Sequence, residues 1–247
     1  MEISLWVIIL FALLYEPVIG YYDFQKFKQR AAVDPAARES YYAQIMTWLW
    51  VPALFILLIV ALTDLTLQQI GLAMPTLGAG TLGSFATGAA YGAITVYALF
   101  LVYYVIGYHT SSKVRHRLTE SRKKEMQKLT YTEILPVTDK EKKQWTYVSL
   151  TAGITEEIIY RGFLIFAFSY LFPTLSIWVV ILAASVIFGL AHTYQGFWAG
   201  VVRTSIVGIV FSIIYVSLGS ILPLIVLHFL LDYVAKLGEE DDREAAA

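Results

Sequence analysis

The segment Thr155-Glu156-Glu157-Ile158-Ile159-Tyr160-Arg161 places two carboxylates and a guanidinium inside an apolar stretch of the chain. Apolar and small residues flank it on both sides, at 152–154 and 162–166. Such a stretch is typical of a membrane-embedded helix, in which an ionisable side chain is costly and marks a functional site. We therefore interpret the rest of the chain outward from this segment.

Helical spacing assigns different tasks to the two glutamates. Adjacent residues of a helix point about 100° apart, so Glu156 and Glu157 face different neighbours. Glu157 and Arg161 are four residues apart on one stripe, which predicts a structural ion pair. Glu156 shares its stripe with Tyr160 and is left available for chemistry.

The composition indicates an integral membrane protein. Of 247 residues, 58% are hydrophobic and 15% charged, with a mean hydropathy of +0.64. Soluble domains carry about 25% charged residues. The chain has no cysteine, which excludes disulfides, thiolate metal sites and a cysteine nucleophile. Residues 1–20 are apolar without a basic leading segment, so we interpret them as the first membrane helix and not as a signal peptide.

The predicted fold is an all-α, polytopic transmembrane helical bundle of about seven spans. The expected spans are 3–20, 44–63, 82–108, 145–171, 175–194, 197–216 and 220–237. The segment 64–80 is expected to form a loop with one amphipathic turn, and an eighth membrane-associated helix there is the alternative. We divide the chain into an N-terminal three-span region with a basic loop, a catalytic four-span core and an acidic solvated tail, at 1–144, 145–237 and 238–247.

Basic residues predict the orientation. The connections 21–40 and 109–144 are rich in Lys and Arg, whereas 64–80 has none. The positive-inside rule places the first two in the cytoplasm, the N-terminus outside and the C-terminus inside. We expect a multi-pass protein of the cell (inner) membrane. The large basic loop is interpreted as a topology signal attracted to anionic lipid, with no role in nucleic-acid binding.

Several other residues receive structural interpretations. A stripe of small residues predicts a helix-packing face in the third span, at Ser84, Gly88 and Gly92. Arg203 is expected to extend to the cytoplasmic surface, and His109 and His116 to be solvated. Glu16, which precedes Pro17, is the one charge within a span that has no assigned role beyond capping a kink.

Four ionisable residues on three of the later spans are expected to lie at a similar depth in the bilayer. His192 closes the fifth span, while His228 and Asp232 share one face of the seventh by their four-residue spacing. Glu156 lies about 11 residues, roughly 16 Å, into a span that enters from the cytoplasm. The topology therefore predicts an active site in the cytoplasmic half of the bilayer.

These motifs also carry a family resemblance. Glu156-Glu157-xxx-Arg161, Phe188-xxx-His192 and His228-xxx-Asp232, in this order, resemble the motifs of the CAAX prenyl protease and bacteriocin-processing family. Its members are also called Abi proteins or type II CAAX endopeptidases. The resemblance covers about residues 130–237. It implies an intramembrane glutamic endopeptidase that needs no cofactor or metal, with the lipid bilayer and a peptide or lipidated-protein substrate as partners.

The resemblance also implies a role for each residue. Glu156 would be the general base that activates a water, and His192 would orient that water and shuttle its proton. His228 and Asp232 match the oxyanion-stabilising positions. The last position is often Asn in the family. An ionised Asp232 would repel an oxyanion, so this side chain must either be protonated or orient His228.

Three alternatives stay open at this point. The first is a zinc metalloprotease whose ligands are Glu156, His192, His228 and Asp232, although the chain has no HExxH helix. The second is a proton-coupled transporter with a buried Glu and His relay. The third is a non-catalytic scaffold or bacteriocin-immunity protein. The sequence also leaves the substrate open between prenylated CAAX proteins and other membrane-associated peptides.

Overall fold

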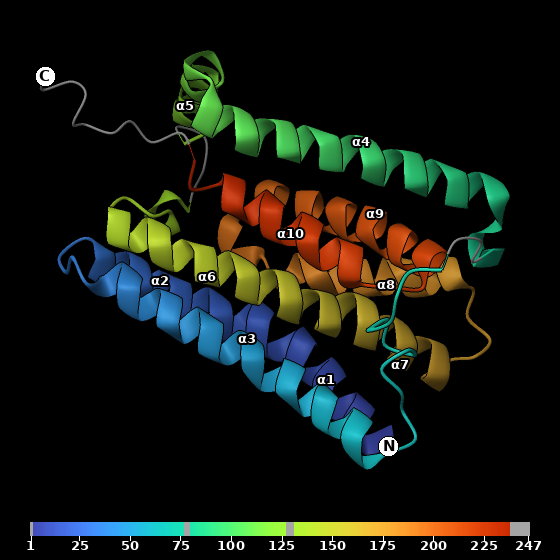
Figure 1. Ribbon diagram of the computed structural model, residues 1–247. Helices are drawn as coiled ribbons and strands as arrows, with labels where there is room; N and C mark the ends of the chain where they lie inside the picture. The colour runs from blue at the N-terminus through green and yellow to red at the C-terminus, as the bar shows by residue number, and fades with distance from the viewer. Residues whose placement is uncertain (1, 77–79, 127–130, 238–247) are drawn as a thin grey trace, which may run out of the picture.

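Helices form all of the regular secondary structure in residues 2–76, 80–126 and 131–237, the parts of the chain that the computed structural model describes (Figure 1). The α-helices are α1 Glu2–Leu14, α2 Tyr21–Ala31, α3 Ala37–Leu62, α4 Gly83–Thr110, α5 Ser112–Met126, α6 Asp139–Glu156, α7 Leu164–Leu171, α8 Ile177–Leu190, α9 Arg203–Leu218 and α10 Leu222–Val234. Three π-helices connect some of them, namely η1 Tyr15–Gly20, η4 Glu157–Phe163 and η6 Phe197–Val202. The predicted all-α class is confirmed, and the acidic tail predicted at 238–247 lies outside the described residues.

Four helical stretches are long and apolar enough to cross a membrane, at 2–31, 37–62, 83–110 and 197–218. Helices α8 and α10 are apolar but only about 20 Å long, against the roughly 30 Å of a bilayer's hydrocarbon core. The continuous stretch of α6, η4 and α7 has ample length and carries the charged cluster of the sequence motif in its middle. The protein is thus an integral membrane protein built from several apolar helices.

The predicted polar connection 21–40 is mostly helical, which is a correction to the first span. The helix predicted at 3–20 continues through η1 and α2, so that residues 2–31 form one 30-residue stretch. Phe24 and Phe27 explain the continuation, because both are buried on one face of α2. They pack in a small aromatic cluster that also contains Tyr42 of α3 and Trp145 of α6.

The long basic connection 109–144 also contains helix. It holds α5 and the beginning of α6, which starts at a capping box in which the Thr138 hydroxyl accepts the Glu141 N–H at 3.2 Å. The Glu141 carboxylate accepts the N–H groups of Val137 and Thr138 at 2.8 and 2.9 Å and pairs with Arg38 at 3.4 Å. Burial raises the pKa of Glu141, but these hydrogen bonds and the Arg38 charge outweigh it, so this pKa lies below its usual value.

The segment 64–80 shows no eighth membrane helix among its described residues. Residues 64–76 form turns and extended chain, and a single 3₁₀ turn follows at Gly80–Leu82. The chain folds back here on the later helices, since Ile221 N–H donates to Gly71 O at 2.9 Å and Thr76 N–H donates to Leu218 O at 2.9 Å.

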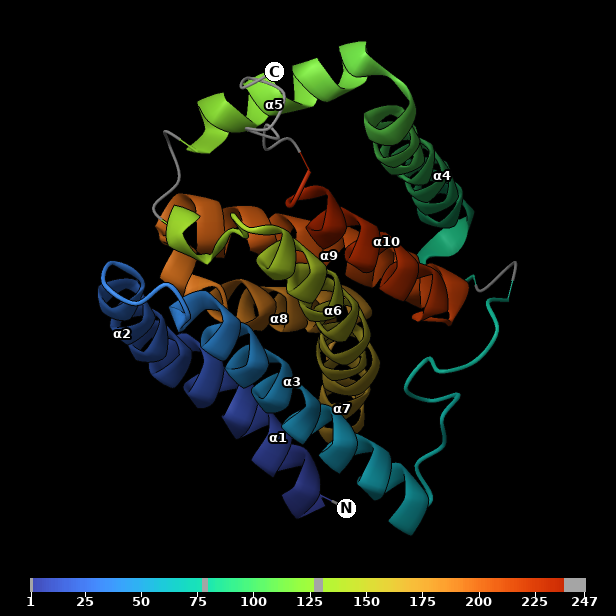
Figure 2. The same cartoon turned by 60° about the vertical axis from the view of Figure 1, so that its left-hand side comes forward.

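The small-residue stripe of α4 faces away from the bundle, so its prediction as a packing face within this chain is wrong. A Cβ at Gly88 or Gly92 would meet nothing within 4 Å. The opposite side of the helix packs instead, through buried Thr87, Ala90 and Leu101. Figure 2 shows α4 at the edge of the bundle, beside α9 and α10.

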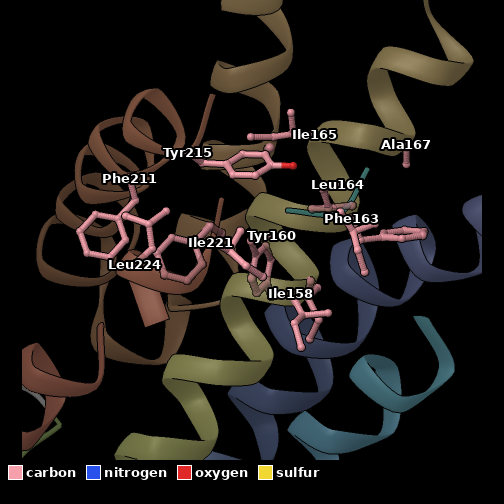
Figure 3. Close-up of a cluster of buried hydrophobic side chains, with 14 of the residues drawn as sticks. Ile158, Tyr160, Phe163, Leu164, Ile165, Ala167, Phe211, Tyr215, Ile221 and Leu224 are labelled. Atoms are coloured by element: carbon pink, nitrogen blue, oxygen red, sulfur yellow. The ribbon is translucent and has the colours of Figure 1, made fainter. Parts of the chain in front are cut away.

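The motif segment lies in the centre of the apolar core. Side chains of η4 and α7 belong to one buried cluster with those of α9 and α10 (Figure 3), which includes Ile158, Phe163, Phe211 and Leu224. Helix α6 packs on α3 and on α10. The contact with α10 is close at Gly153, where a Cβ would lie 3.0 Å from both Ile225 O and Phe229 N. A glycine is needed there, and the approach brings His228 to the glutamates.

Ion pairs join the two basic connections at one end of the bundle, at the left of Figure 1. Arg38 Nε donates to Glu133 O at 2.7 Å, and Lys28 Nζ lies 3.0 Å from the Glu133 carboxylate. Lys140 Nζ lies 2.5 Å from Glu39. We call these five residues the ion-pair cluster. It places residues 21–40 and the end of 109–144 on the same side of the bundle.

Candidate active site

Glu157 is the fully buried centre of the polar group. Its Oε1 accepts a hydrogen bond from Arg161 Nη1 at 3.0 Å, which confirms the pair predicted from the four-residue spacing. The same oxygen accepts from His228 Nδ1 at 2.7 Å, a contact that the sequence did not indicate. The Arg161 guanidinium is 1% exposed and lies over the rings of Phe188 and Phe211, 4.0 and 5.3 Å from their centroids. Glu157 therefore links η4 to α10 and fixes the His228 ring.

The second nitrogen of His228 faces the other two carboxylates. Its Nε2 lies 3.7 Å from Glu156 Oε2 and 3.7 Å from Asp232 Oδ2. Both distances are too long for a hydrogen bond but short enough for charge attraction. Glu156 Oε2 is buried and has no hydrogen-bond partner in the described chain, although a buried polar atom normally has one. Glu156 thus retains free hydrogen-bonding capacity.

Asp232 does not contact Nδ1 of His228, so it does not orient the ring through that nitrogen. The hydrogen bond to Nδ1 belongs to Glu157, whereas Asp232 faces Nε2 and its side chain is 34% exposed. The backbone oxygen of Asp232 accepts from Trp145 Nε1 at 2.9 Å, which ties the end of α10 to α6. Sequence spacing placed His228 and Asp232 on one face correctly, but it could not tell which carboxylate holds the ring.

His192 lies in the turn that follows α8. Its Nδ1 donates to the Phe188 carbonyl oxygen at 2.9 Å, which leaves Nε2 as the nitrogen available to a ligand or a water. The Phe188 ring touches both histidines, with centroid distances of 4.9 Å to His192 and 6.3 Å to His228. The turn is anchored to η1, because the Thr193 hydroxyl donates to Pro17 O at 3.1 Å.

A cavity of about 100 Å³ opens between the N-terminal helices and the motif helices. Glu156 and His192 both line it, so the structure brings these two predicted residues to one space. Glu16 lines the same cavity. It makes no hydrogen bond or ion pair with another described residue, and the chain around Pro17 forms a π-helix. The only signal for Glu16 in the sequence was an acid within an apolar span.

The remaining predicted residues lie apart from this group. Arg203 Nη2 donates to the Tyr131 hydroxyl at 3.0 Å in an exposed position, as expected for a side chain that extends to the surface. His109 is exposed, and the His116 side chain is 73% exposed. Within the parts of the chain that the structure describes, no three His, Asp or Glu side chains are grouped to hold a metal ion.

Apolar helices surrounding a largely buried cluster of Glu, His, Asp and Arg define a membrane protein with a polar site among its helices. Residues 141–234 match the family model described as Type II CAAX prenyl endopeptidase Rce1-like. The match contains the six site residues of the three motifs and confirms the resemblance seen in the sequence. The chain therefore carries a segment of a CAAX-type membrane protease family. Searches of curated proteins and of solved structures found no match.

Proposed function

We propose that the protein is an intramembrane glutamic endopeptidase in which Glu156 activates a water against a peptide bond. One observation carries the proposal. A buried carboxylate oxygen of Glu156 has no hydrogen-bond partner, lies 3.7 Å from a histidine nitrogen, and belongs to a residue that lines a cavity shared with His192. Such an oxygen is suited to accept a proton from a water in that cavity. The match to an endopeptidase family supports the reaction class.

In this mechanism Glu156 takes a proton from water as the oxygen attacks the carbonyl carbon of the scissile bond. His192 accepts a hydrogen bond from the water through Nε2, because its Nδ1 is engaged by Phe188 O. When the tetrahedral intermediate collapses, the carbon–nitrogen bond breaks. Glu156 then passes its proton to the leaving nitrogen, and the products are a carboxylic acid and an amine.

His228 is proposed to stabilise the oxyanion from Nε2, the nitrogen that faces Glu156. Glu157 and Arg161 support it, since the Glu157 hydrogen bond to Nδ1 sets the ring orientation. Asp232 faces the same Nε2. Protonated Asp232 would add a second donor, which accounts for an acid at a position where the family often has Asn.

The proposal includes the arrangement in the membrane. Seven spans, with the basic connections in the cytoplasm of the cell (inner) membrane, place the site in the cytoplasmic half of the bilayer. The ion-pair cluster supports this, because it joins both basic connections at one end of the bundle. We propose CAAX-type prenylated peptides, or other membrane-associated peptides, as the substrate. The division into 1–144, 145–237 and 238–247 stays a prediction.

The test is cleavage of a farnesylated CAAX peptide by the purified protein in detergent. Glu156→Gln should lower the rate at least about 100-fold, the usual contribution of a general base. Glu120→Gln is the matched control, because this glutamate lies exposed on α5 away from the site. A chelator should leave the parent rate unchanged. Full activity in Glu156→Gln would refute the proposal, whereas chelator inhibition reversed by a stoichiometric divalent ion would show a metalloprotease instead.

A further inference from the structure

Glu16 is a carboxylate in the membrane without a partner. It lies within the apolar stretch 2–31 and forms no hydrogen bond or ion pair with any other described residue. An ionisable side chain within a membrane span costs free energy, so its presence there indicates a functional site. Glu16 is carried by the π-helical turn Tyr15–Gly20, a feature that is frequently found at functional sites.

The position of Glu16 relative to the site is fixed. The chain neighbours of Glu16 and His192 are joined by the hydrogen bond from the Thr193 hydroxyl to Pro17 O. Glu16 thus lies in the wall of the cavity that η1, α2 and α3 contribute, while Glu156 and His192 belong to the opposite wall, formed by the motif segments. A group bound in this cavity therefore lies between a wall that carries Glu16 and a wall that carries Glu156.

The lining of the cavity is suited to a cation. Its aromatic side chains include Tyr15, Tyr41 and Trp48, and neither Lys nor Arg lines it. The other acid of the N-terminal wall, Asp23, is already engaged by Gln44 at 3.1 Å and by a lysine of its own helix. Of the two acids on the N-terminal wall, Glu16 is therefore the one without a partner among the described residues. A carboxylate among aromatic faces is the chemistry that binds ammonium and guanidinium groups.

We propose that Glu16 is a specificity-determining residue that binds a cationic group of the substrate, the ammonium of a lysine or the guanidinium of an arginine. The identity of the ligand as a peptide rests on the proposed function. The volume of about 100 Å³ suits the end of one side chain and is well below the roughly 300–1,000 Å³ of pockets that enclose whole ligands. Glu16 therefore selects a single residue of the substrate next to the bond that Glu156 hydrolyses.

The first experiment measures cation binding without any peptide. Saturating n-butylammonium or n-butylguanidinium should raise the Tm of the purified protein by about 3 °C more than n-butanol does. The difference should disappear in Glu16→Gln. Glu2→Gln is the matched control, because Glu2 begins the same helix and lies outside the cavity, so it should keep the full shift.

The second experiment uses labelled farnesylated CAAX peptides that carry lysine or its neutral analogue norleucine at successive positions. Binding is measured by fluorescence anisotropy in the Glu156→Gln variant, which should bind the peptide without cleaving it. At one position, the lysine peptide should bind at least tenfold more tightly than the norleucine peptide. This lysine preference should fall below about twofold when Glu16→Gln is added. The Glu16→Lys variant should instead bind most tightly the peptide that carries glutamate at that position.

The outcomes separate the two proposals. Ammonium stabilisation that is absent, or that persists in Glu16→Gln, overturns the cation site, and so does a lysine preference that is independent of Glu16. A Glu16-dependent ammonium shift in a protein that cleaves no peptide leaves the cation site standing and refutes the endopeptidase alone.

Discussion

Replacing Glu157 by Gln should separate support of the site from its chemistry, because the change keeps the shape of the side chain and removes only its charge. In the parent, Oε1 of this fully buried carboxylate accepts from Arg161 at 3.0 Å and from His228 at 2.7 Å. In Glu157→Gln the guanidinium, itself 1% exposed, keeps no counter-charge at this distance. Breaking a buried ion pair by removing one partner costs about 3–5 kcal/mol.

We expect about 3 kcal/mol, the lower end of that range, because the amide oxygen can still accept one of the two hydrogen bonds. The matched control is Glu156→Gln, an identical change one residue earlier. Glu156 Oε2 has no hydrogen-bond partner and its side chain is 12% exposed, so its loss should change the free energy of unfolding by less than about 1 kcal/mol. Both variants should lose peptidase activity, Glu157→Gln because the His228 ring is no longer fixed.

The assay is equilibrium unfolding in mixed detergent micelles, followed by far-UV circular dichroism, together with hydrolysis of the farnesylated peptide. A pair of apolar residues should recover stability without activity, since Glu157→Leu with Arg161→Met removes both charges of the buried ion pair and leaves no acceptor for His228 Nδ1. Equal unfolding free energies for Glu157→Gln and Glu156→Gln would refute the assignment of Glu157 as the residue that holds the site.

Three further predictions test other parts of the structure. The lowered pKa of Glu141 means that its stabilising contribution is present above its unfolded pKa of about 4.3 and is lost as pH falls through the folded pKa. Glu141→Gln should therefore cost about 1 kcal/mol at neutral pH, and thermal unfolding should show the gap to the parent closing in acid. Gly153→Ala should cost about 1–3 kcal/mol in the same measurement, because the new Cβ meets the α10 backbone, whereas Gly88→Ala should be neutral or stabilising. A cysteine in place of Ser121 should react with a membrane-impermeant thiol reagent only after the cells are opened, and labelling from outside intact cells would contradict the proposed topology.

The sequence predicted the parts of the structure that depend on short spacing. The Glu157–Arg161 pair and the shared face of His228 and Asp232 follow from four-residue steps along one helix, and both are present. The approach of these helices to Glu156 could be predicted because charges in a bilayer avoid lipid and gather in the interior. These are local rules of helix geometry and solvation, and they need no knowledge of how the bundle packs.

Contacts between distant segments could not be predicted in this way. The hydrogen bond from His228 to Glu157 joins residues 71 apart, and no periodicity marks it. The role of Glu16 depends on a π-helical turn, which has no sequence rule as strong as helical spacing. The small residues of α4 fit a packing rule, yet the buried face is the opposite one, with Thr87, Ala90 and Leu101, and no sequence period distinguished the two faces. Phe24 and Phe27 showed a buried face only once their partners on α3 and α6 were known.

The ion-pair cluster also bears on how the protein is made. Arg38 finds its acceptor in Glu133, 95 residues later in the chain. At a synthesis rate of about 5–20 residues per second, the ribosome needs roughly 5–20 s to cover that distance. Throughout this interval Arg38 lacks the acceptors at Glu133 and Glu141 that join α3 to the beginning of α6. Insertion and docking are therefore separate events in the biogenesis of this protein, and a chain arrested before Glu133 would present its first helices undocked to the quality-control machinery of the membrane.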